Sequence, residues 1–370
     1  MRIVITGADG FIGKNLRVRL AELGHADVVG VIRSTAPDAL RDALAEADFV
    51  FHLAGVNRPQ NPAEFLVGNA ELTQNLCAAL ADVGRQTTVV LASSMQAELA
   101  NPYGQSKLAA EEIVQQYGQE TRAPVYLFRL PNVFGKWCRP NYNSAVATFC
   151  HNIARGLPIT INDPATPLKL VHVDDVMEAF VRLLVAPVVE SGFVEVGPVY
   201  TTTVGGVADA LRSFAESRVS LITPRVGTGL ARALYGTYIS YLPPESFVYE
   251  VPRHGDSRGV FVEMLKTPDC GQFSYFTAHP GITRGEHYHH SKTEKFLVIN
   301  GTAHFGFRHI TTGETYELIA RGGEPRIVET VPGWAHDITN IGDDELIVML
   351  WANEIFDQQK PDVVAMKVKP

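Results

Sequence analysis

Tyr103 and Lys107 stand four positions apart in a stretch with helical patterning, so they share one face of a helix. An ammonium group beside a phenol favours the phenolate, and we therefore expect a lowered pKa for Tyr103. Such a tyrosine can protonate a carbonyl oxygen while a hydride reaches the carbonyl carbon. A hydroxyl at the end of the preceding strand, from Ser93 or Ser94, could hold the same oxygen. The Tyr-x-x-x-Lys spacing by itself is common by chance.

A second group with chemical potential is a histidine cluster, because His287, His289 and His290 fall within four residues. Positions 287 and 289 share one face of a strand, so two imidazoles can converge on one ion. Glu294 adds a carboxylate, and His336 from a facing strand would complete four ligands. The set favours a divalent metal. Zn²⁺ is the first choice, and Ni, Fe or Mn would also suit an open nitrogen and oxygen site.

Three glycines follow a short apolar run at residues 2–6 and precede a helical pattern. The run indicates a buried parallel strand. The glycines permit a tight turn, and the helix N-terminus would offer backbone N–H groups to a pyrophosphate. A glycine-rich turn without a ligand is the alternative. The loop residues expected to contact a dinucleotide are Gly7, Asp9, Gly10, Phe11, Ile12 and Gly13.

Arg33 follows the second predicted strand, residues 28–32. A site that prefers NAD usually carries Asp or Glu at this place to hold the ribose 2′-hydroxyl. A guanidinium suits a 2′-phosphate instead, which favours NADPH, although a solvated arginine is the alternative. The end of the third predicted strand adds Leu53 and Ala54 to the expected cofactor contacts.

The elements that must position these residues change along the chain. Strands and helices alternate at first, which predicts a doubly wound parallel α/β sheet with ligands at the strand carboxyl ends. Pro243-Pro244 ends this pattern, because proline cannot continue a helix. Short alternating segments separated by turns such as Asn300-Gly301 then predict an all-β sandwich or barrel. We expect two domains, residues 1–243 and residues 244–370.

The composition excludes several kinds of protein. The 370 residues are 46% hydrophobic and 19% charged, which is typical of a folded chain. A net charge of −8 without a long basic run argues against nucleic acid and anionic membranes as partners. No apolar stretch is long enough for a membrane span or placed as in a signal peptide. The four cysteines, Cys270 among them, lack a C-x-x-C spacing and indicate thiols in a reducing cytoplasm.

Several motifs of the first 240 residues follow the order of a known family: the glycine loop, His52-Leu53-Ala54-Gly55, Ser94, Tyr103 with Lys107, Arg129-Leu130-Pro131-Asn132-Val133-Phe134-Gly135 and Val171-His172-Val173-Asp174-Asp175-Val176. Together they resemble the extended short-chain dehydrogenase/reductases of nucleotide sugars, which have a Rossmann-type fold. The resemblance implies Tyr103 as acid/base, Lys107 on the nicotinamide ribose, Ser94 on the carbonyl and Asn132 near the sugar nucleotide. Fewer residues than usual separate Ser94 from Tyr103, so Ser93 stays open as the catalytic serine.

The histidine region resembles a second family. Gly281-x5-His287-x-His289-x4-Glu294-x6-Gly301 and Pro332-Gly333-Trp334-Ala335-His336-x3-Asn340 resemble the two metal motifs of the cupin (jelly-roll) barrel, the second motif without its leading glycine. Asp256-x-Arg258-Gly259-x-Phe261-x-Glu263 and Arg284-Gly285-x-His287 resemble sugar-nucleotide 4-keto-hexose 3,5-epimerases, in which this histidine is the catalytic base. A ligand histidine has its lone pair occupied, so we favour His287 as a ligand. His290 or Tyr288 would then move the proton.

The combination of domains is similar to the CapF/WbjC-type enzymes of capsular polysaccharide synthesis. The resemblance implies C3 epimerisation of a UDP-2-acetamido-2,6-dideoxy-hexos-4-ulose in the cupin. Reduction at C4 with NADPH would follow and give UDP-N-acetyl-6-deoxy-L-talosamine, a precursor of UDP-N-acetyl-L-fucosamine. The resemblance also suggests a homodimer through the cupin. A proton beside a carbonyl is acidic only while the carbonyl exists, so epimerisation must come first.

Two alternatives to this bifunctional enzyme remain open. The barrel could be a structural, dimerising module beside a reductase that is the sole enzyme. The N-terminal domain could instead be an epimerase or dehydratase. Met95-Gln96 after Ser94 argues against a 4,6-dehydratase, which would carry an Asp-Glu pair there.

Overall fold

The computed structural model describes residues 1–185, 190–251, 253–256, 259–262, 265, 267, 271–354 and 359–369, with only the backbone of residues 253–256, 259–262 and 272. Arg258, Glu263 and Cys270, which the sequence analysis named, lie outside the described residues. The chain divides into two compact units. The first contains Met1–Ser144 and Leu168–Thr201, and the second contains Ala145–Pro167 and Thr202–Pro370.

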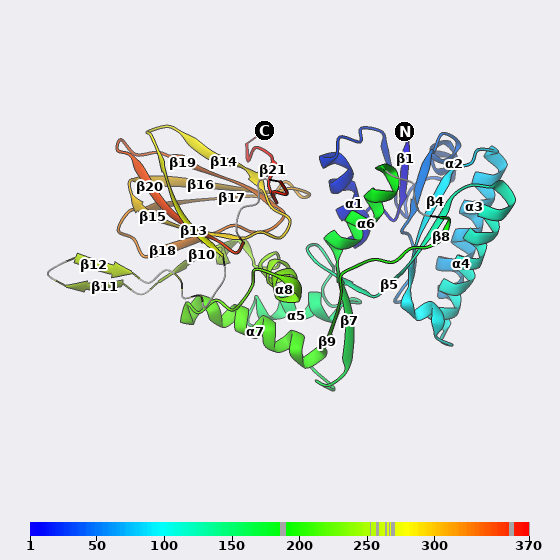
Figure 1. Cartoon of the computed structure of the whole chain (residues 1–370), viewed down its shortest axis with the longest axis horizontal. Coiled ribbons are helices and arrows are strands. Elements are labelled where there is room, and N and C mark those ends of the chain that lie inside the picture. Colours follow the sequence, from blue (N-terminus) through cyan, green and yellow to red (C-terminus); the bar gives the residue numbers. More distant parts are fainter. Residues whose placement is uncertain are drawn as a thin grey trace. The chain divides into compact units, whose positions relative to one another are not determined.

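A six-stranded sheet in the order β2-β1-β3-β4-β5-β8 forms the centre of the first unit (Figure 1). The strands, all paired in parallel, are β1 (Ile3–Thr6), β2 (Val28–Val31), β3 (Phe49–His52), β4 (Thr88–Ser94), β5 (Val125–Leu130) and β8 (Gly192–Phe193). β1 and β3 are buried along their whole length, as expected of β-branched and aromatic strands covered on both faces. The chain order reverses between β1 and β3, which is where sheets of this kind bind ligands.

Helices cover both faces of this sheet and confirm the predicted Rossmann-type α/β fold. One face packs against α1 (Phe11–Glu22) and α6 (Val173–Val185) through residues such as Leu16 and Phe180. The other face packs against α2 (Pro37–Ala45), α3 (Leu72–Val83) and α4 (Pro102–Thr121) through residues such as Leu80 and Val114. Two short helical turns, η1 (Leu66–Glu71) and η2 (Met95–Glu98), and a smaller sheet of β6 (Asn132–Phe134), β7 (Pro167–His172) and β9 (Val199–Thr203) complete the fold.

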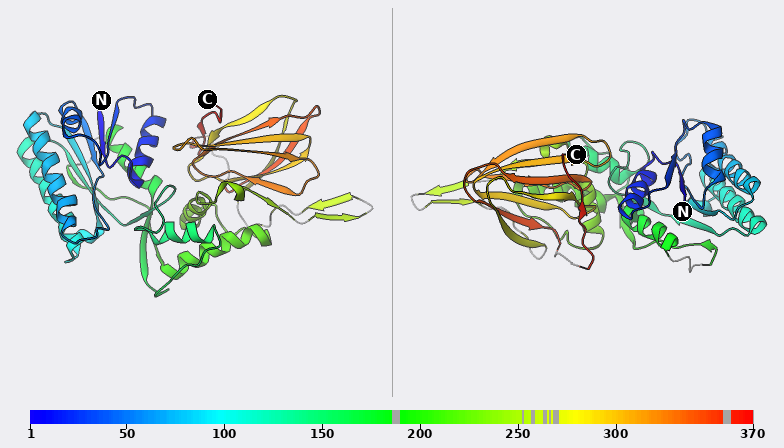
Figure 2. Two further views of the ribbon diagram at one scale, coloured as in Figure 1. Left: turned by 180° about the vertical axis from the view of Figure 1, so that it is seen from behind. Right: turned by 90° about the horizontal axis from the view of Figure 1, so that it is seen from above.

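The second unit contains two five-stranded sheets, β10-β18-β15-β20-β13 and β17-β16-β19-β14-β21. Their strands are β10 (Val248–Glu250), β13 (Gln272–Ala278), β14 (Thr283–Tyr288), β15 (Glu294–Asn300), β16 (Thr302–His309), β17 (Thr315–Arg321), β18 (Arg326–Glu329), β19 (Trp334–Asn340), β20 (Leu346–Ala352) and β21 (Val364–Ala365). The two sheets lie face to face (Figure 2), and Phe296 of one packs on Phe305 of the other with ring centroids 6.0 Å apart. This confirms the predicted all-β cupin barrel.

Three helices that precede Pro243 in the sequence also belong to the second unit: α5 (Ala145–Ile153), α7 (Val204–Ser220) and α8 (Gly229–Ile239). The short helix η3 (Pro244–Ser246) leads from them into β10, and β11 (Arg253–Asp256) pairs with β12 (Gly259–Val262) as a separate hairpin. The compact unit around the barrel therefore begins earlier in the chain than the barrel strands do.

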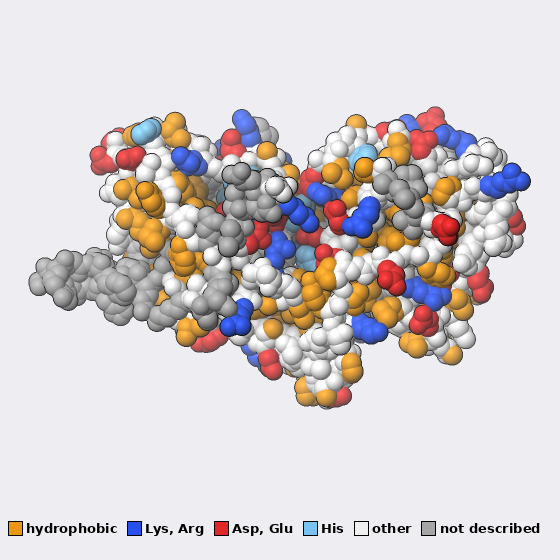
Figure 3. Space-filling model, viewed as in Figure 1, with side chains coloured by type: hydrophobic (Ala, Val, Ile, Leu, Met, Phe, Trp, Pro, Cys, Tyr) orange, Lys and Arg blue, Asp and Glu red, His pale blue; other side chains and the backbone are white. Residues whose placement is uncertain are grey.

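The surface and the helices bear on the predicted partners. On the face seen in Figure 3, lysine and arginine side chains are interspersed with aspartate and glutamate. Among the helices of the described residues, none has the length and apolar character needed to cross a membrane.

Candidate active site and metal site

The glycine loop lies between β1 and α1, where the strand order reverses. Gly7 has a φ of 67°, and a Cβ on it would lie 2.8 Å from the backbone nitrogen of Ala54. A Cβ on Gly13 would lie 2.2 Å from the carbonyl oxygen of Gly7. Glycine is thus required for the chain to pass this closely. The first turn of α1, described in full, has neither an acidic side chain nor a side-chain cap, so its backbone N–H groups suit an anionic ligand.

The other predicted cofactor residues surround this loop. Arg33 is exposed just beyond the end of β2, and Leu53 and Ala54 follow directly after β3. β1 pairs with both of these strands, so the predicted residues gather at one edge of the sheet. Arg17 of α1, which the sequence analysis missed, also approaches β2, since its Nε would lie 3.7 Å from a Cβ on Gly30.

Tyr103 and Lys107 lie in the first two turns of α4, which Asn101 caps by accepting the N–H of Gly104 at 2.8 Å. Ser94, whose hydroxyl oxygen accepts the N–H of Gln96 at 3.2 Å, lies close enough to the hydroxyl of Tyr103 to act on its pKa. The neighbouring Ser93 is buried and donates its hydroxyl to Glu111 at 2.5 Å, on the opposite side of the strand. Ser94 is therefore the serine that lies beside the tyrosine.

The electrostatics of this group differ from the expectation. Burial raises the pKa of Tyr103, and the neighbouring Ser94 opposes this only in part, so the predicted lowering is wrong for this structure. The Lys107 ammonium donates to the carbonyl oxygen of Ala92 at 2.7 Å. Burial lowers the pKa of Lys107 to about 8, although the charge of Glu111 acts in the other direction.

A buried hydrogen-bond chain, which the sequence analysis missed, connects β1 with α4. Thr6 Oγ1 lies 2.7 Å from His52 Nδ1, and His52 Nε2 lies 3.0 Å from Thr73 Oγ1. Burial lowers the pKa of His52 to about 3, so the ring is neutral. The Thr73 hydroxyl donates to the backbone oxygen of Asn69, and the Asn69 amide donates to Ser106 at 2.9 Å. These hydrogen bonds order the backbone next to the part of α4 that carries Tyr103 and Lys107.

Asn132, the residue predicted to lie near the sugar nucleotide, belongs to β6 and is exposed. Its amide donates to the backbone oxygen of Lys169 at 3.1 Å. It therefore lies on the three-stranded sheet, whereas Ser94 lies on the six-stranded one.

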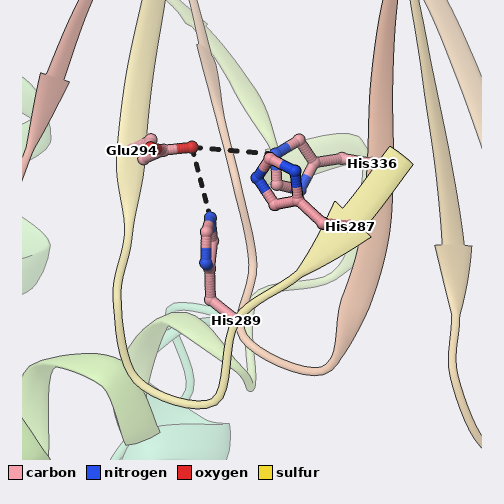
Figure 4. Close-up of side chains that lie close together, drawn as sticks. All are labelled: His287, His289, Glu294 and His336. Carbon is pink, nitrogen blue, oxygen red and sulfur yellow. Dashed lines mark hydrogen bonds and ion pairs between the residues drawn. The ribbon is translucent and has the colours of Figure 1, made fainter. Parts of the chain in front are cut away.

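In the second unit, His287, His289, Glu294 and His336 come together, with one potential ligand atom of each within 4.8 Å of the others. Glu294 Oε2 lies 3.3 Å from His289 Nε2 and 3.7 Å from His336 Nε2. Figure 4 shows the three imidazoles and the carboxylate turned toward one another. Glu294 opens β15 in one sheet, and His336 comes from β19 in the other, so the cluster lies between the sheets.

The local backbone explains how the first two histidines reach the cluster. A bulge at Glu286, which has a φ of 55°, interrupts the ladder between β14 and β19 and brings His287 opposite His336. β14 ends at Tyr288, so His289 lies just beyond the strand. The sequence analysis had placed it on the strand. The imidazoles of His287 and His289 still meet, with centroids 4.9 Å apart.

Hydrogen bonds on the outer side of the cluster indicate that a cation fits inside it. His289 Nδ1 faces the carbonyl oxygen of Asp362 at 2.5 Å, and His287 Nδ1 faces that of Gly285 at 3.0 Å. A carbonyl only accepts, so both Nδ1 atoms carry a proton and both Nε2 atoms present a lone pair. The lone pair of His289 would repel the Glu294 oxygen unless a proton or a cation lies between them. Two atoms bound to a tetrahedral zinc at about 2.0–2.1 Å are about 3.3 Å apart, which matches the distance between Glu294 and His289, and the four ligand atoms together lie within 4.8 Å of one another.

The protonation states also suit ligands. Burial, together with the charges of His336 and His289, lowers the pKa of His287 to about 4. Burial alone would raise the pKa of Glu294, but the adjacent imidazoles of His289 and His336 and the charge of Lys292 hold it well below its usual value. Lys292, which the sequence analysis missed, pairs with Glu294 Oε1 at 2.9 Å and leaves Oε2 facing the histidines.

The two predicted proton carriers of the barrel lie elsewhere. The rings of Tyr288 and His290 pack on each other with centroids 5.6 Å apart, and Tyr288 is buried. Their positions alternate with those of His287 and His289, and neither belongs to the four-residue cluster found among the described residues. A role for either residue in proton transfer stays a prediction.

Two family models match the chain. The NAD dependent epimerase/dehydratase family matches residues 3–197, and the polysaccharide biosynthesis C-terminal domain matches residues 254–364. The first match covers the glycine loop and Tyr103, and the second covers the four clustered residues of the barrel.

Known proteins resemble the chain over its whole length or over its first part. A UDP-2-acetamido-2,6-beta-L-arabino-hexul-4-ose reductase of Pseudomonas aeruginosa is 56% identical over 368 residues, which cover 100% of this chain and 99% of the relative. A GDP-6-deoxy-D-mannose reductase of the same species is 32% identical over 216 residues, which cover 50% of this chain and 70% of that reductase. The crystal structure of the capsular polysaccharide assembling protein CapF from Staphylococcus aureus, 41% identical, covers 100% of both chains with a TM-score of 0.69.

Proposed function

We propose that this chain, which belongs to the NAD dependent epimerase/dehydratase family in the two-domain form of the CapF-type enzymes, reduces the 4-keto group of a nucleotide sugar. The observation that carries the proposal is the placement of Tyr103 and the buried Lys107 in the first two turns of α4, with Ser94 beside the Tyr103 hydroxyl. The name of the full-length reductase relative supports a UDP-sugar with a ketone at C4 as the substrate class.

The proposed reduction uses the residues at the edge of the first sheet. The glycine loop binds the pyrophosphate and Arg33 holds the 2′-phosphate of NADPH, which supplies the hydride when bound. Tyr103 donates its hydroxyl proton to the oxygen at C4, and Ser94 holds this oxygen by a hydrogen bond. Lys107 contacts the nicotinamide ribose, and Asn132 contacts the sugar nucleotide.

If Arg33 holds the 2′-phosphate of NADPH, replacement by alanine should reduce the preference for NADPH over NADH, as measured by the ratio of kcat/KM values.

We further propose that the barrel epimerises the same ketone at C3 before reduction. His287, His289, Glu294 and His336 would hold a divalent ion, Zn²⁺ by preference, which supplies Lewis acidity toward the keto oxygen when bound. His287 serves as a ligand, since its Nδ1 is engaged with Gly285 and its Nε2 faces the cluster. His290 or Tyr288 carries the proton. The order follows from the chemistry, because the proton at C3 loses its acidity once the ketone is reduced.

The full proposal takes a UDP-2-acetamido-2,6-dideoxy-hexos-4-ulose to UDP-N-acetyl-6-deoxy-L-talosamine for capsule or O-antigen synthesis. Residues 1–243 would perform the reduction and residues 244–370 the epimerisation, in a homodimer joined through the barrel. The full-length similarity to a capsular polysaccharide assembling protein supports the place in capsule synthesis.

An exchange experiment tests the epimerase half. The 4-keto sugar nucleotide is incubated with the enzyme in D₂O without NADPH, and deuterium at C3 is measured by mass spectrometry and NMR. We expect incorporation that depends on the enzyme. Absence of incorporation, with NADPH oxidation intact, would favour a reductase with a structural barrel.

A further inference from the structure

The segment Asp362–Val368, called here the C-terminal strap, lies against the part of the barrel that carries the first two proposed ligands. β21 within the strap pairs with the end of β14, with Ala365 opposite His287. The backbone N–H of Met366 donates to the carbonyl oxygen of Glu286 at 2.8 Å. Val368 is buried next to Gly306, where a Cβ would lie 3.1 Å from its side chain. The strap is therefore fixed at several points along the ligand-bearing strand.

Asp362 makes the closest contacts of the strap. Its carboxylate accepts the backbone N–H groups of His290, Ser291 and Lys292, each at 2.8 Å, and the Ser291 hydroxyl at 3.1 Å. Its own carbonyl oxygen accepts the Nδ1–H of His289 at 2.5 Å. The side chain of Asp362 thus anchors the loop after His289, and its backbone orients the imidazole itself.

We propose that Asp362 is a positioning residue that presets His289 for the metal, so that the strap determines the metal affinity of the barrel. The inference rests on the proposed metal site. The Asp362 carbonyl fixes the proton on Nδ1 and keeps Nε2 directed at Glu294. Hydrogen-bond partners of this kind typically contribute about 10–100-fold to metal affinity. Without the Asp362 carboxylate, nothing in this set of contacts would hold the loop after His289 in place beside the Asp362 carbonyl.

Zinc binding to the full-length protein tests this proposal. Chelator-stripped wild type and the variants Asp362→Ala, Asp362→Asn and Lys369→Ala are titrated with Zn²⁺ against a chromophoric chelator. We expect Asp362→Ala to bind Zn²⁺ about 10–100-fold more weakly. Asp362→Asn should lose less, because its amide oxygen still accepts a backbone N–H. Lys369→Ala is the matched control from the same part of the chain, since Lys369 pairs only at the surface with Glu317, at 3.2 Å.

The outcomes separate this inference from the metal site itself. Circular dichroism and NADPH binding report whether each variant is folded. If Asp362→Ala does not fold, the zinc affinity of Asp362→Asn tests the proposal. Zinc affinity within twofold of wild type in folded Asp362→Ala, or in Asp362→Asn where Asp362→Ala does not fold, would overturn the strap's role, as would an equal loss in Lys369→Ala. If wild type binds no Zn²⁺, or His336→Ala binds it as tightly as wild type, the proposed metal site fails and the inference fails with it.

Discussion

Tyr103 can be changed at the single atom that the proposed reduction uses. Phenylalanine keeps the ring, which packs against Phe65 with centroids 5.4 Å apart, but removes the proton donor. We expect Tyr103→Phe to lower kcat for NADPH oxidation by about 10²–10⁴-fold and to leave deuterium exchange in the barrel unchanged. Tyr117→Phe on the same helix loses only a hydrogen bond to the Thr87 carbonyl and is the control. Loss of both activities in a folded Tyr103→Phe protein would contradict separate sites.

Lys107 should impose an alkaline limit on the reduction. Burial lowers its pKa to about 8, so the ammonium loses its proton as pH rises through this value, and kcat/KM should fall on that side. The charge of Glu111 supports the ammonium. Glu111→Gln should therefore move the alkaline limb to lower pH, and the exposed Glu112→Gln should not. A pH–rate profile of the three proteins checks this, and an alkaline limb that stays in place in Glu111→Gln would count against the assigned role of Lys107.

Residue spacing predicted which side chains meet, but it did not predict their hydrogen-bond partners or the direction of their pKa shifts. The four-residue step between Tyr103 and Lys107 was sufficient because helix periodicity is a local property. His287 and His289 also meet, but through a bulge at Glu286 and the end of β14 rather than through strand periodicity. The choice between Ser93 and Ser94 depends on Glu111, 18 positions from Ser93, and no local pattern contains that contact. The pKa shift of Tyr103 was predicted in the wrong direction because it depends on burial.

At the scale of elements, helix α7 is joined to the barrel by a buried ion pair. Arg218 of α7 contacts Glu329 of β18 at 2.5 Å, and Glu329 is fully buried and also pairs with Lys295. We expect Arg218→Ala to lower the free energy of unfolding by about 3 kcal/mol, because removal of one partner leaves a buried charge with less compensation. Arg212→Ala on the same helix breaks only an exposed pair with Asp209 and should cost about 0–1 kcal/mol. Urea unfolding measures both. Equal losses would show that the buried pair adds nothing.

Where the elements differ from the prediction, a physical reason can be identified. β15, β16 and β20 fit the short alternating segments expected after Pro243-Pro244, because their apolar residues alternate or run together. A strand was also expected at positions 287 and 289, but β14, with the sequence TRGEHY, contains a bulge and ends at Tyr288, before His289. The association of α7 with the barrel rests on a contact between Arg218 and Glu329, 111 positions apart, so composition near Pro243 gave no sign of it.

At the scale of the whole molecule, each unit contains a complete set of its own proposed site residues. Ser94, Tyr103 and Lys107 belong to the first unit, and the four-residue cluster belongs to the second. Each motif set lies within one stretch of the chain, which is why spacing along the sequence could group its residues; separate chemistry in the two units stays a prediction. The two proposed reactions should therefore respond separately to treatments that affect one unit.

Removal of metal provides that treatment. A chelator would strip the histidine cluster, whereas no residue assigned to the reduction is a proposed metal ligand. We expect the chelated enzyme to lose deuterium exchange at C3 and to regain it with added Zn²⁺. It should still oxidise NADPH when supplied with a ketone already epimerised at C3, because Tyr103 and Ser94 need no metal to donate their hydrogen bonds. Circular dichroism shows whether the barrel stays folded during chelation. If chelation abolished reduction of the pre-epimerised ketone while the fold persisted, the reductase would depend on the barrel, and the assignment of one reaction to each unit would have to be abandoned.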